Sequence, residues 1–391
     1  MAFGLLVTAV EGHASMIMPP ARNSVDANLP AWSGGKHPPT GTIDRKAAPC
    51  TNGTSVCDSG QSTFWFSQGC TIGCARCDGN GSRVANFDHC PGRSIKPTLL
   101  PRYRTANRRA LPGSPQDVFK FNPWMAPGLA PTYDPCGMAG GAPVPTTAAA
   151  EYNPTKYAKQ GDLGSVVLAP RPSGTVWTRG TVAYVRQQST APHGGGYVYR
   201  LCPAGENLTE ACFNRLQLAF ATPGTHMLRF ADPALDREVN ATMVTEGGGK
   251  GWMVYPWPSG SCPGGVCSGD CMYVVGPGKH CYYRNGTRDN GAGPPVPGKP
   301  YCPGCGAPLY GSDGACPCLG PHTCPDVPRD AGSDLAFTPD PAPGHAASTY
   351  AVEDGLHVPA GITPGEYVLG YRWDAEMTSQ VWSSCADITI E

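Results

Sequence analysis

The chain has 391 residues, of which 29 are basic and 30 are acidic, so its formal net charge at pH 7 is −1. This balance argues against a nucleic-acid groove and against a polybasic membrane patch. Only 15% of the residues are charged, while 51 are glycine and 43 are proline. Such a composition favours short strands joined by many turns over long helices.

The first twelve residues, MAFGLLVTAVEG, look like a signal peptide that is truncated at its start. An apolar run over 3–10 precedes small residues and a plausible cleavage site after Gly12. The segment lacks a basic start and is shorter than the usual length of about 15–30 residues. No later segment of the sequence approaches the roughly 20 apolar residues that span a bilayer. We therefore expect a secreted, soluble, extracellular protein with a single mature domain over 13–391.

Cysteine is far more frequent here, with 19 residues, than in a typical reduced cytosolic protein. We interpret 50–145, with its Pro/Gly-rich joints, as disulfide-tied loops over a core formed later in the chain. Nine further cysteines lie between 262 and 324, where apolar residues are scarce, so we interpret 258–330 as a cysteine-rich insertion. The pattern indicates a disulfide-stapled glycoprotein. Its five N-x-S/T sequons are at Asn52, Asn80, Asn207, Asn240 and Asn285.

Strand patterns become regular after residue 160, whereas 13–160 reads as mostly irregular. In GYVYRL and EYVLGYRW every second side chain would face the same side. These features predict an all-β protein, an antiparallel β-sandwich with long loops. The predicted strands, β-branched or aromatic and mostly bounded by Gly, Pro or Asn, cover 164–170, 180–188, 195–202, 215–221, 240–247, 365–375 and 385–391.

The histidine at position 13 would be the first residue of the mature chain if cleavage follows Gly12. A histidine at a free amino terminus offers two nitrogens to one metal ion, the α-amino group and Nδ1. A second imidazole would complete a three-nitrogen set, which suits Cu(II). On its own, His13 is better explained as an ordinary histidine near a chain end.

The segment APHGGGYVYRLCP places His193 directly before three glycines and a strongly patterned strand. Glycine permits a positive φ and a close approach of the backbone, which is consistent with a shaped surface around a site. A hairpin turn with an incidental histidine explains the motif equally well.

Six segments carry a family resemblance: HASMIMPPARNSVD, FWFSQGCTIGCARCDGNG, FNPWMAP, YDPCGMAGG, HGGGYVYRLCPAGENLTEACF and YVLGYRWDAEMTSQVWSSCADITIE. Together they resemble the lytic polysaccharide monooxygenases, also described as chitin-binding type-4 domains, in particular the secreted forms of oomycetes and algae. The resemblance spans most of 13–247 and 350–391 and is weak across the insertion. It implies an immunoglobulin-like β-sandwich whose flat face presents one copper ion in a histidine brace.

The resemblance implies that His13 ligates copper through its amino nitrogen and Nδ1, and His193 through one imidazole nitrogen. It also implies an aromatic residue on the copper axis. Trp382 is the nearest candidate, although Phe or Tyr is more familiar there and a Trp packed between the sheets is an equal interpretation. Gln380 would point the same way on a strand and could orient a copper-bound oxygen species, or it could be a solvated strand-end residue. Ala375 stands where the family pattern suggests Cys, which would leave one cysteine unpaired.

The reaction implied by the resemblance is oxidative cleavage of a structural polysaccharide such as chitin, cellulose or a pectin-like glycan. An external electron donor would reduce the copper, and O2 or H2O2 would be the co-substrate. Hydrogen would be abstracted from C1 or C4 of a sugar. We expect this polysaccharide as the partner, no nucleic-acid or membrane partner, and a monomeric protein.

Other classes of function remain open on the sequence. A non-catalytic polysaccharide-binding protein would stack sugars on exposed aromatic residues such as Trp32, Trp65 or Trp124. A structural cell-wall glycoprotein would account for the sequons and the insertion. The CPGC and CPC motifs over 302–318 have a zinc-ribbon spacing, but disulfides explain them better in an oxidising compartment. The sequence shows no paired-carboxylate signature of a hydrolytic glycosidase.

Overall fold

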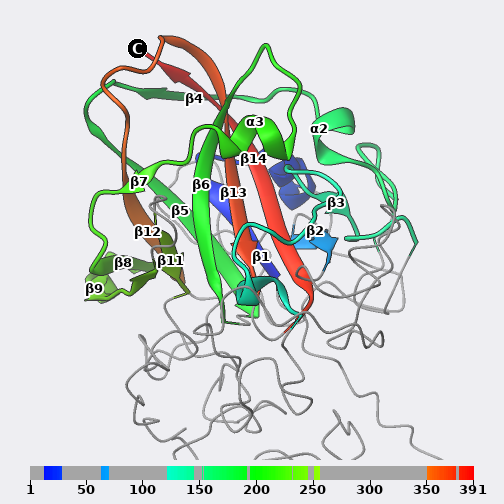
Figure 1. Ribbon diagram of the computed structural model, residues 1–391, viewed down its shortest axis with the longest axis horizontal. Coiled ribbons are helices and arrows are strands. Elements are labelled where there is room, and N and C mark those ends of the chain that lie inside the picture. The colour runs from blue at the N-terminus through cyan, green and yellow to red at the C-terminus, as the bar shows by residue number, and fades with distance from the viewer. Residues whose placement is uncertain are drawn as a thin grey trace, which may run out of the picture.

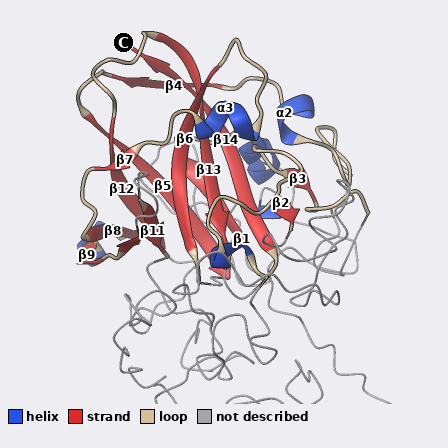
Figure 2. Cartoon of the chain, viewed as in Figure 1, coloured by secondary structure: helices blue, strands red, loops and turns tan. Residues whose placement is uncertain are grey.

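The computed structural model describes only part of the chain, and that part is built mainly of strands with a few short helices (Figure 2). The predicted insertion over 258–330 lies outside it, as do most of the loops over 50–145, so their disulfide ties stay predictions. The described residues are 13–28, 63–69, 121–144, 152, 154–191, 194–230, 232–244, 251–255, 350–375 and 378–391.

The first sheet has six strands in the order β1-β5-β12-β8-β9, with β7 paired to β12. All of its strand pairs are antiparallel. The strands are β1 (His13–Met18), β5 (Val182–Ala191), β7 (Ala219–Phe220), β8 (Thr225–Phe230), β9 (Arg237–Asn240) and β12 (Tyr350–His357).

The second sheet has eight strands in the order β10-β11-β6-β13-β14-β2-β3, and β4 adds to β14. Its pairs are antiparallel except for β4 with β14, which is parallel. The strands are β2 (Trp65–Gln68), β3 (Met138–Ala139), β4 (Pro172–Trp177), β6 (Gly196–Pro203), β10 (Met243–Val244), β11 (Trp252–Val254), β13 (Gly365–Asp374) and β14 (Gln380–Ile390).

The helices lie outside the two sheets. Figure 1 shows α3 in front of β6 and β13, with strands of the first sheet behind them. The helices are α2 (Gly164–Val167), α3 (Glu210–Asn214) and the 3-10 helices η1 (Arg22–Asn28), η3 (Pro123–Met125) and η5 (Pro233–Leu235).

One buried apolar cluster fills the space between the sheets. Met16, Val185 and Val352 contribute to it from the first sheet, and Tyr371 and Trp382 from the second. Because successive strand residues face opposite sides, alternating residues of a strand enter this cluster, as Tyr197, Tyr199 and Leu201 of β6 do. The structure confirms the predicted all-β sandwich of antiparallel sheets.

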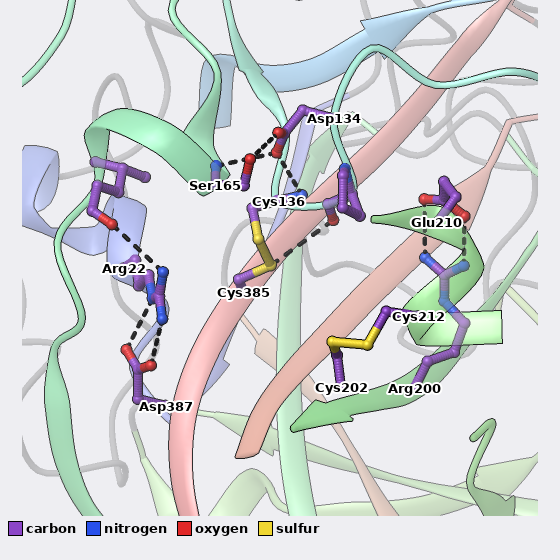
Figure 3. The surroundings of a disulfide bond; sticks show 12 residues. Arg22, Asp134, Cys136, Ser165, Arg200, Cys202, Glu210, Cys212, Cys385 and Asp387 are labelled. Atoms are coloured by element: carbon purple, nitrogen blue, oxygen red, sulfur yellow. Dashed lines mark hydrogen bonds and ion pairs between the residues drawn. A yellow bond between two sulfur atoms is a disulfide. The ribbon is translucent and has the colours of Figure 1, made fainter. Parts of the chain in front are cut away.

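The outer face of the second sheet is also covered, so β6 is buried on both of its faces. The Cys202–Cys212 disulfide joins β6 to α3 on this face, and Cys136–Cys385 joins the loop before β3 to β14 (Figure 3). The second disulfide connects residues 249 positions apart. It ties one described loop from the early part of the chain onto a strand formed later.

The segment 164–170, predicted as a strand, instead begins with the helical turn α2, so that prediction is wrong. Asp134 accepts hydrogen bonds from both the backbone N–H and the hydroxyl of Ser165, and the Gly164 N–H donates to the Gly137 carbonyl at 2.8 Å. A Cβ at position 164 would lie 2.8 Å from the Cys136 carbonyl oxygen. These ties favour a turn, and they leave Val166 exposed despite its β-branched side chain.

Candidate functional site

The first candidate metal ligand, His13, begins β1, and its backbone pairs with Ala191 at the end of β5. The register shifts between His13 and Ala14, which is the mark of a β-bulge. Bulges re-aim side chains and are frequent beside active sites. The His13 side chain and the whole of His193 lie outside the described residues. His193 follows Ala191, the last residue of β5, by two positions in the sequence.

The three glycines after His193 each have a conformational reason. Gly194 and Gly195 adopt φ values of 63° and 80°, which side chains disfavour. Gly196 has no room for a side chain, because a Cβ would lie 2.5 Å from the ring of Trp124 and 2.7 Å from the Met253 carbonyl oxygen. The structure thus confirms both uses of glycine expected from the motif, positive φ and close approach.

Two buried groups hold the backbone directly after His193. The Trp373 Nε1–H donates to the Gly194 carbonyl at 2.8 Å, and the Tyr255 backbone N–H donates to the Gly195 carbonyl at 2.9 Å. Sequence reasoning did not identify Trp373 as part of the site. Its alternation with other inward-facing residues in GYRWDA indicated only a core position.

Trp382 and Gln380, the other two predicted site residues, lie together on β14. The Trp382 Nε1–H donates to Gln380 Oε1 at 3.3 Å, which confirms that they point the same way. Trp382 is fully buried and stacks on Phe66 with ring centroids 4.3 Å apart. Gln380 is buried as well, so it is not a solvated strand-end residue, and its Oε1 also accepts from the Thr378 hydroxyl at 3.1 Å. The copper-axis role of Trp382 stays a prediction.

A polar cluster lies in the core next to the β1–β5 strand pair. The Tyr255 hydroxyl donates to Gln187 Oε1, and the Tyr371 hydroxyl donates to the same oxygen at 3.3 Å. Burial raises the pKa of both phenols, so they remain protonated donors at neutral pH. Because Gln187 pairs with Met16 in the β1–β5 ladder, these bonds tie the second sheet to the strand pair that begins at His13.

A second buried polar group joins the two sheets nearby. The Tyr197 hydroxyl donates to Asp354 Oδ2 at 2.7 Å, and Asp354 Oδ1 lies 2.8 Å from Nδ1 of His226. Burial, and then the Asp354 carboxylate, raise the pKa of Tyr197 well above its ordinary value. All three side chains are inaccessible to solvent, so this group acts as a structural tie between β6, β8 and β12.

A buried ion pair fastens residues 126–130 to the outer face of the second sheet. Arg372 Nε lies 2.7 Å from Asp374 Oδ1, and both side chains are about fully buried. Asp374 Oδ2 accepts the Gly128 N–H at 2.7 Å, while Arg372 Nη2 donates to the Ala130 carbonyl at 2.9 Å. This satisfaction of donors and acceptors is what a buried charge requires.

Glu210 of α3 completes this charged network (Figure 3). It lies 2.6 Å from Arg200 and 3.2 Å from Arg372. Burial disfavours its charged form, but the two guanidinium groups outweigh burial and lower the pKa of Glu210 to about 2. Asp134 shows the opposite balance, because burial raises its pKa although Ser165 donates to it. The bonds of the charged network hold α3 and residues 126–130 against the second sheet.

The aromatic residues suggested for stacking on sugars are not on the surface. Trp65 and Trp124 are both 0% exposed, so the stacking role is wrong for these two. Trp32 lies outside the described residues. The sequons at Asn207 and Asn240 are exposed, as a glycan would require. Ala375, placed where Cys was expected, is buried in the core between the sheets.

No cluster of three or more His, Cys, Asp or Glu side chains with metal-binding geometry occurs among the described residues. Both predicted brace side chains and the CPGC and CPC motifs fall outside that set, so neither metal prediction is tested. Within the described part of the chain, no helix has the length and hydropathy to cross a membrane.

Comparison with known proteins does not add a family assignment. No protein-family model matches the chain, and no curated protein matches it either.

Proposed function

We propose that this protein is a secreted, copper-dependent lytic polysaccharide monooxygenase whose metal is held by His13 and His193. The observation that carries the proposal is the β1–β5 register, in which the His13 backbone pairs with Ala191, two residues before His193. His13 and Ala191, which are 178 positions apart in sequence, share this end of the strand pair.

The donor chemistry fits copper. With cleavage after Gly12, His13 would contribute an amino nitrogen and an imidazole, and His193 a second imidazole. A three-nitrogen set of this kind suits Cu(II), which stands highest in the divalent affinity order. Copper held there would be reduced by an external donor and would activate O2 or H2O2.

Buried residues between the two sheets would support such a centre. The buried bonds of Gln187 with Tyr255 and Tyr371 hold β5 against the second sheet. Gln380 Oε1 accepts from Thr378 and Trp382, which fixes the orientation of the Gln380 amide and leaves its NH2 as the donating end. Rigid groups of this kind are what a metal centre needs to keep its ligands in one geometry.

The amino terminus provides the sharpest test. One version of the protein begins at His13, and a matched control retains Gly12 and therefore has no free amino group on His13. We expect only the first version to bind Cu(II) tightly, with an axial electron paramagnetic resonance (EPR) spectrum. With a reductant and O2 or H2O2, it should release oxidised oligosaccharides from chitin, cellulose or pectin.

A His193→Ala variant that begins at His13 should also lose copper. Equal copper affinity in all three proteins, or no copper binding in any of them, would refute the proposed centre. Binding of a polysaccharide without oxidised products, in a copper-loaded protein, would instead favour a non-catalytic binding protein. Mass spectrometry of the naturally secreted protein would establish whether its first residue is His13.

A further inference from the structure

The backbone on both sides of His193 is fixed by described residues. On one side, Ala191 pairs with His13 in the β1–β5 ladder. On the other side, the Gly194 carbonyl accepts the Trp373 Nε1–H at 2.8 Å, and the Gly195 carbonyl accepts the Tyr255 N–H at 2.9 Å. The first fixed point after His193 is therefore a bond to a side chain from β13.

The Trp373 indole is itself held firmly. It is fully buried, and its backbone lies between Tyr197 of β6 and Trp382 of β14 in the ladder. Its ring packs on Tyr255 at 4.4 Å and lies parallel to within 28° of Trp382 at 6.2 Å. A close-packed indole has little freedom to turn, and an unpaired buried N–H would be costly. Packing in the core, rather than the loop, therefore sets the direction of the Trp373 indole N–H toward Gly194.

We propose that Trp373 is a positioning residue of the predicted copper centre: its indole N–H, bonded to the Gly194 carbonyl, fixes the backbone directly after the predicted ligand His193. This inference rests on the proposed function for its metal. It requires no contact between Trp373 and copper, because the tryptophan acts through the peptide that follows His193.

The first test needs no metal. The Tyr255 amide is protected by its bond to the Gly195 carbonyl, so its hydrogen-exchange rate reports on the loop. The reference amide is Ala204, which donates to Glu366 at 2.9 Å near the other end of β6 and β13. In Trp373→Phe we expect the exchange of Tyr255 to accelerate by about tenfold relative to Ala204, as loss of a buried hydrogen bond predicts.

Two control variants separate the bond from general damage to the core. Tyr367→Phe removes a similar bond on the same strand, from its hydroxyl to the Thr363 carbonyl at 2.8 Å. Trp177→Phe removes the same atoms from the same core, beside Ile390 at the far end of β14. Neither should change the ratio of the Tyr255 and Ala204 exchange rates. If Trp373→Phe does not fold, a benzothiophene ring in place of the Trp373 indole keeps the shape and removes only the N–H.

The second test uses copper in proteins that begin at His13. Relative to wild type, Trp373→Phe should shift the Cu(II) EPR parameters and weaken copper affinity by about 10-fold or more, the size of effect seen for groups that orient metal ligands. Tyr367→Phe and Trp177→Phe should keep the wild-type spectrum. A purely structural role for Trp373 would lower stability without moving that spectrum.

The outcomes distinguish this inference from the proposed function. Unchanged Tyr255 exchange in the Trp373 variants overturns the inference, and so does accelerated exchange with wild-type EPR parameters and affinity. If the wild-type protein binds no copper, the proposed function fails. The exchange ratio then decides alone whether Trp373 positions the segment after His193.

Discussion

The two ends of β13 are built differently. At the end near the candidate site, Arg372, Trp373 and Asp374 are fully buried and bond to Ala130, Gly194 and Gly128, which are 179 to 246 residues away. At the other end, Tyr367 bonds to Thr363 four residues away, and the exposed Glu366 accepts from Thr389 across the β13–β14 ladder.

Long-range side-chain bonds thus concentrate at the site end of β13. The side-chain hydrogen bonds at the far end join residues 4 and 23 positions apart, whereas those at the site end form only when segments from three parts of the chain have come together. Substitutions at the site end should therefore cost more and should reach the candidate ligands, and matched substitutions at the far end should do neither.

The largest effect is expected from Asp374→Asn. The change keeps the shape of the side chain but removes the nearer of the two carboxylates on the buried Arg372 guanidinium, leaving only Glu210 at 3.2 Å, and weakens the acceptor for the Gly128 N–H. Removing one partner of a buried pair costs about 3–5 kcal/mol. We expect a loss of that size in the free energy of unfolding, measured by urea denaturation.

The control for this change is Glu206→Gln, which removes one partner of the mostly exposed Glu206–Arg215 pair beyond the far end of β6. An exposed pair contributes little, so the expected change is within about 0.5 kcal/mol. Equal losses in the two variants would show that the buried pair does not distinguish the site end.

A smaller effect is expected from Gly196→Ala, at the first residue of β6. The new Cβ would lie 2.5 Å from Trp124 and 2.7 Å from the backbone oxygen of Met253, which cannot simply rotate away. Overpacking of this kind costs about 1–3 kcal/mol. The free energy of unfolding should fall by that amount, and the Tyr255 amide should exchange faster because the same loop is displaced.

Gly205→Ala provides the comparison, since Gly205 lies just past the other end of β6 with open space around it. There the substitution should be neutral, or stabilising by up to about 1 kcal/mol through a less flexible unfolded chain. A loss of stability as large as that of Gly196→Ala would contradict the contrast between the two ends.

The same contrast explains what the sequence could predict. The long strands β5, β6, β13 and the end of β14 were predicted from their β-branched and aromatic residues, because that signal is local. The strand β12 was not predicted, since it carries Glu353 and Asp354 in its middle. Glu353 is stabilised there by Arg186 and Arg229, and Asp354 by Tyr197 and His226, all from other strands.

For the same reason, the candidate site could be predicted from the sequence only in part. The glycines after His193 were a local signal for positive φ and close packing, and the structure bears that out. The pairing of His13 with Ala191 and the bond from Trp373 to Gly194 are long-range, and no periodicity along the chain encodes them. These long-range pairs can be identified only once the two sheets are assembled.

The smallest effect concerns pH and Glu210, which touches the site-end network through Arg372 but is itself about a quarter exposed. Its pKa is about 2 in the folded protein against an ordinary value of 4.5. A lowered pKa contributes stability that is fully present above pH 4.5 and is lost as the pH falls from 4.5 toward 2. Stability in urea should therefore fall less steeply over that window in Glu210→Gln than in wild type. Glu206→Gln should follow the wild-type curve, and identical slopes in wild type and Glu210→Gln would show that the two arginines do not hold the carboxylate in its charged form.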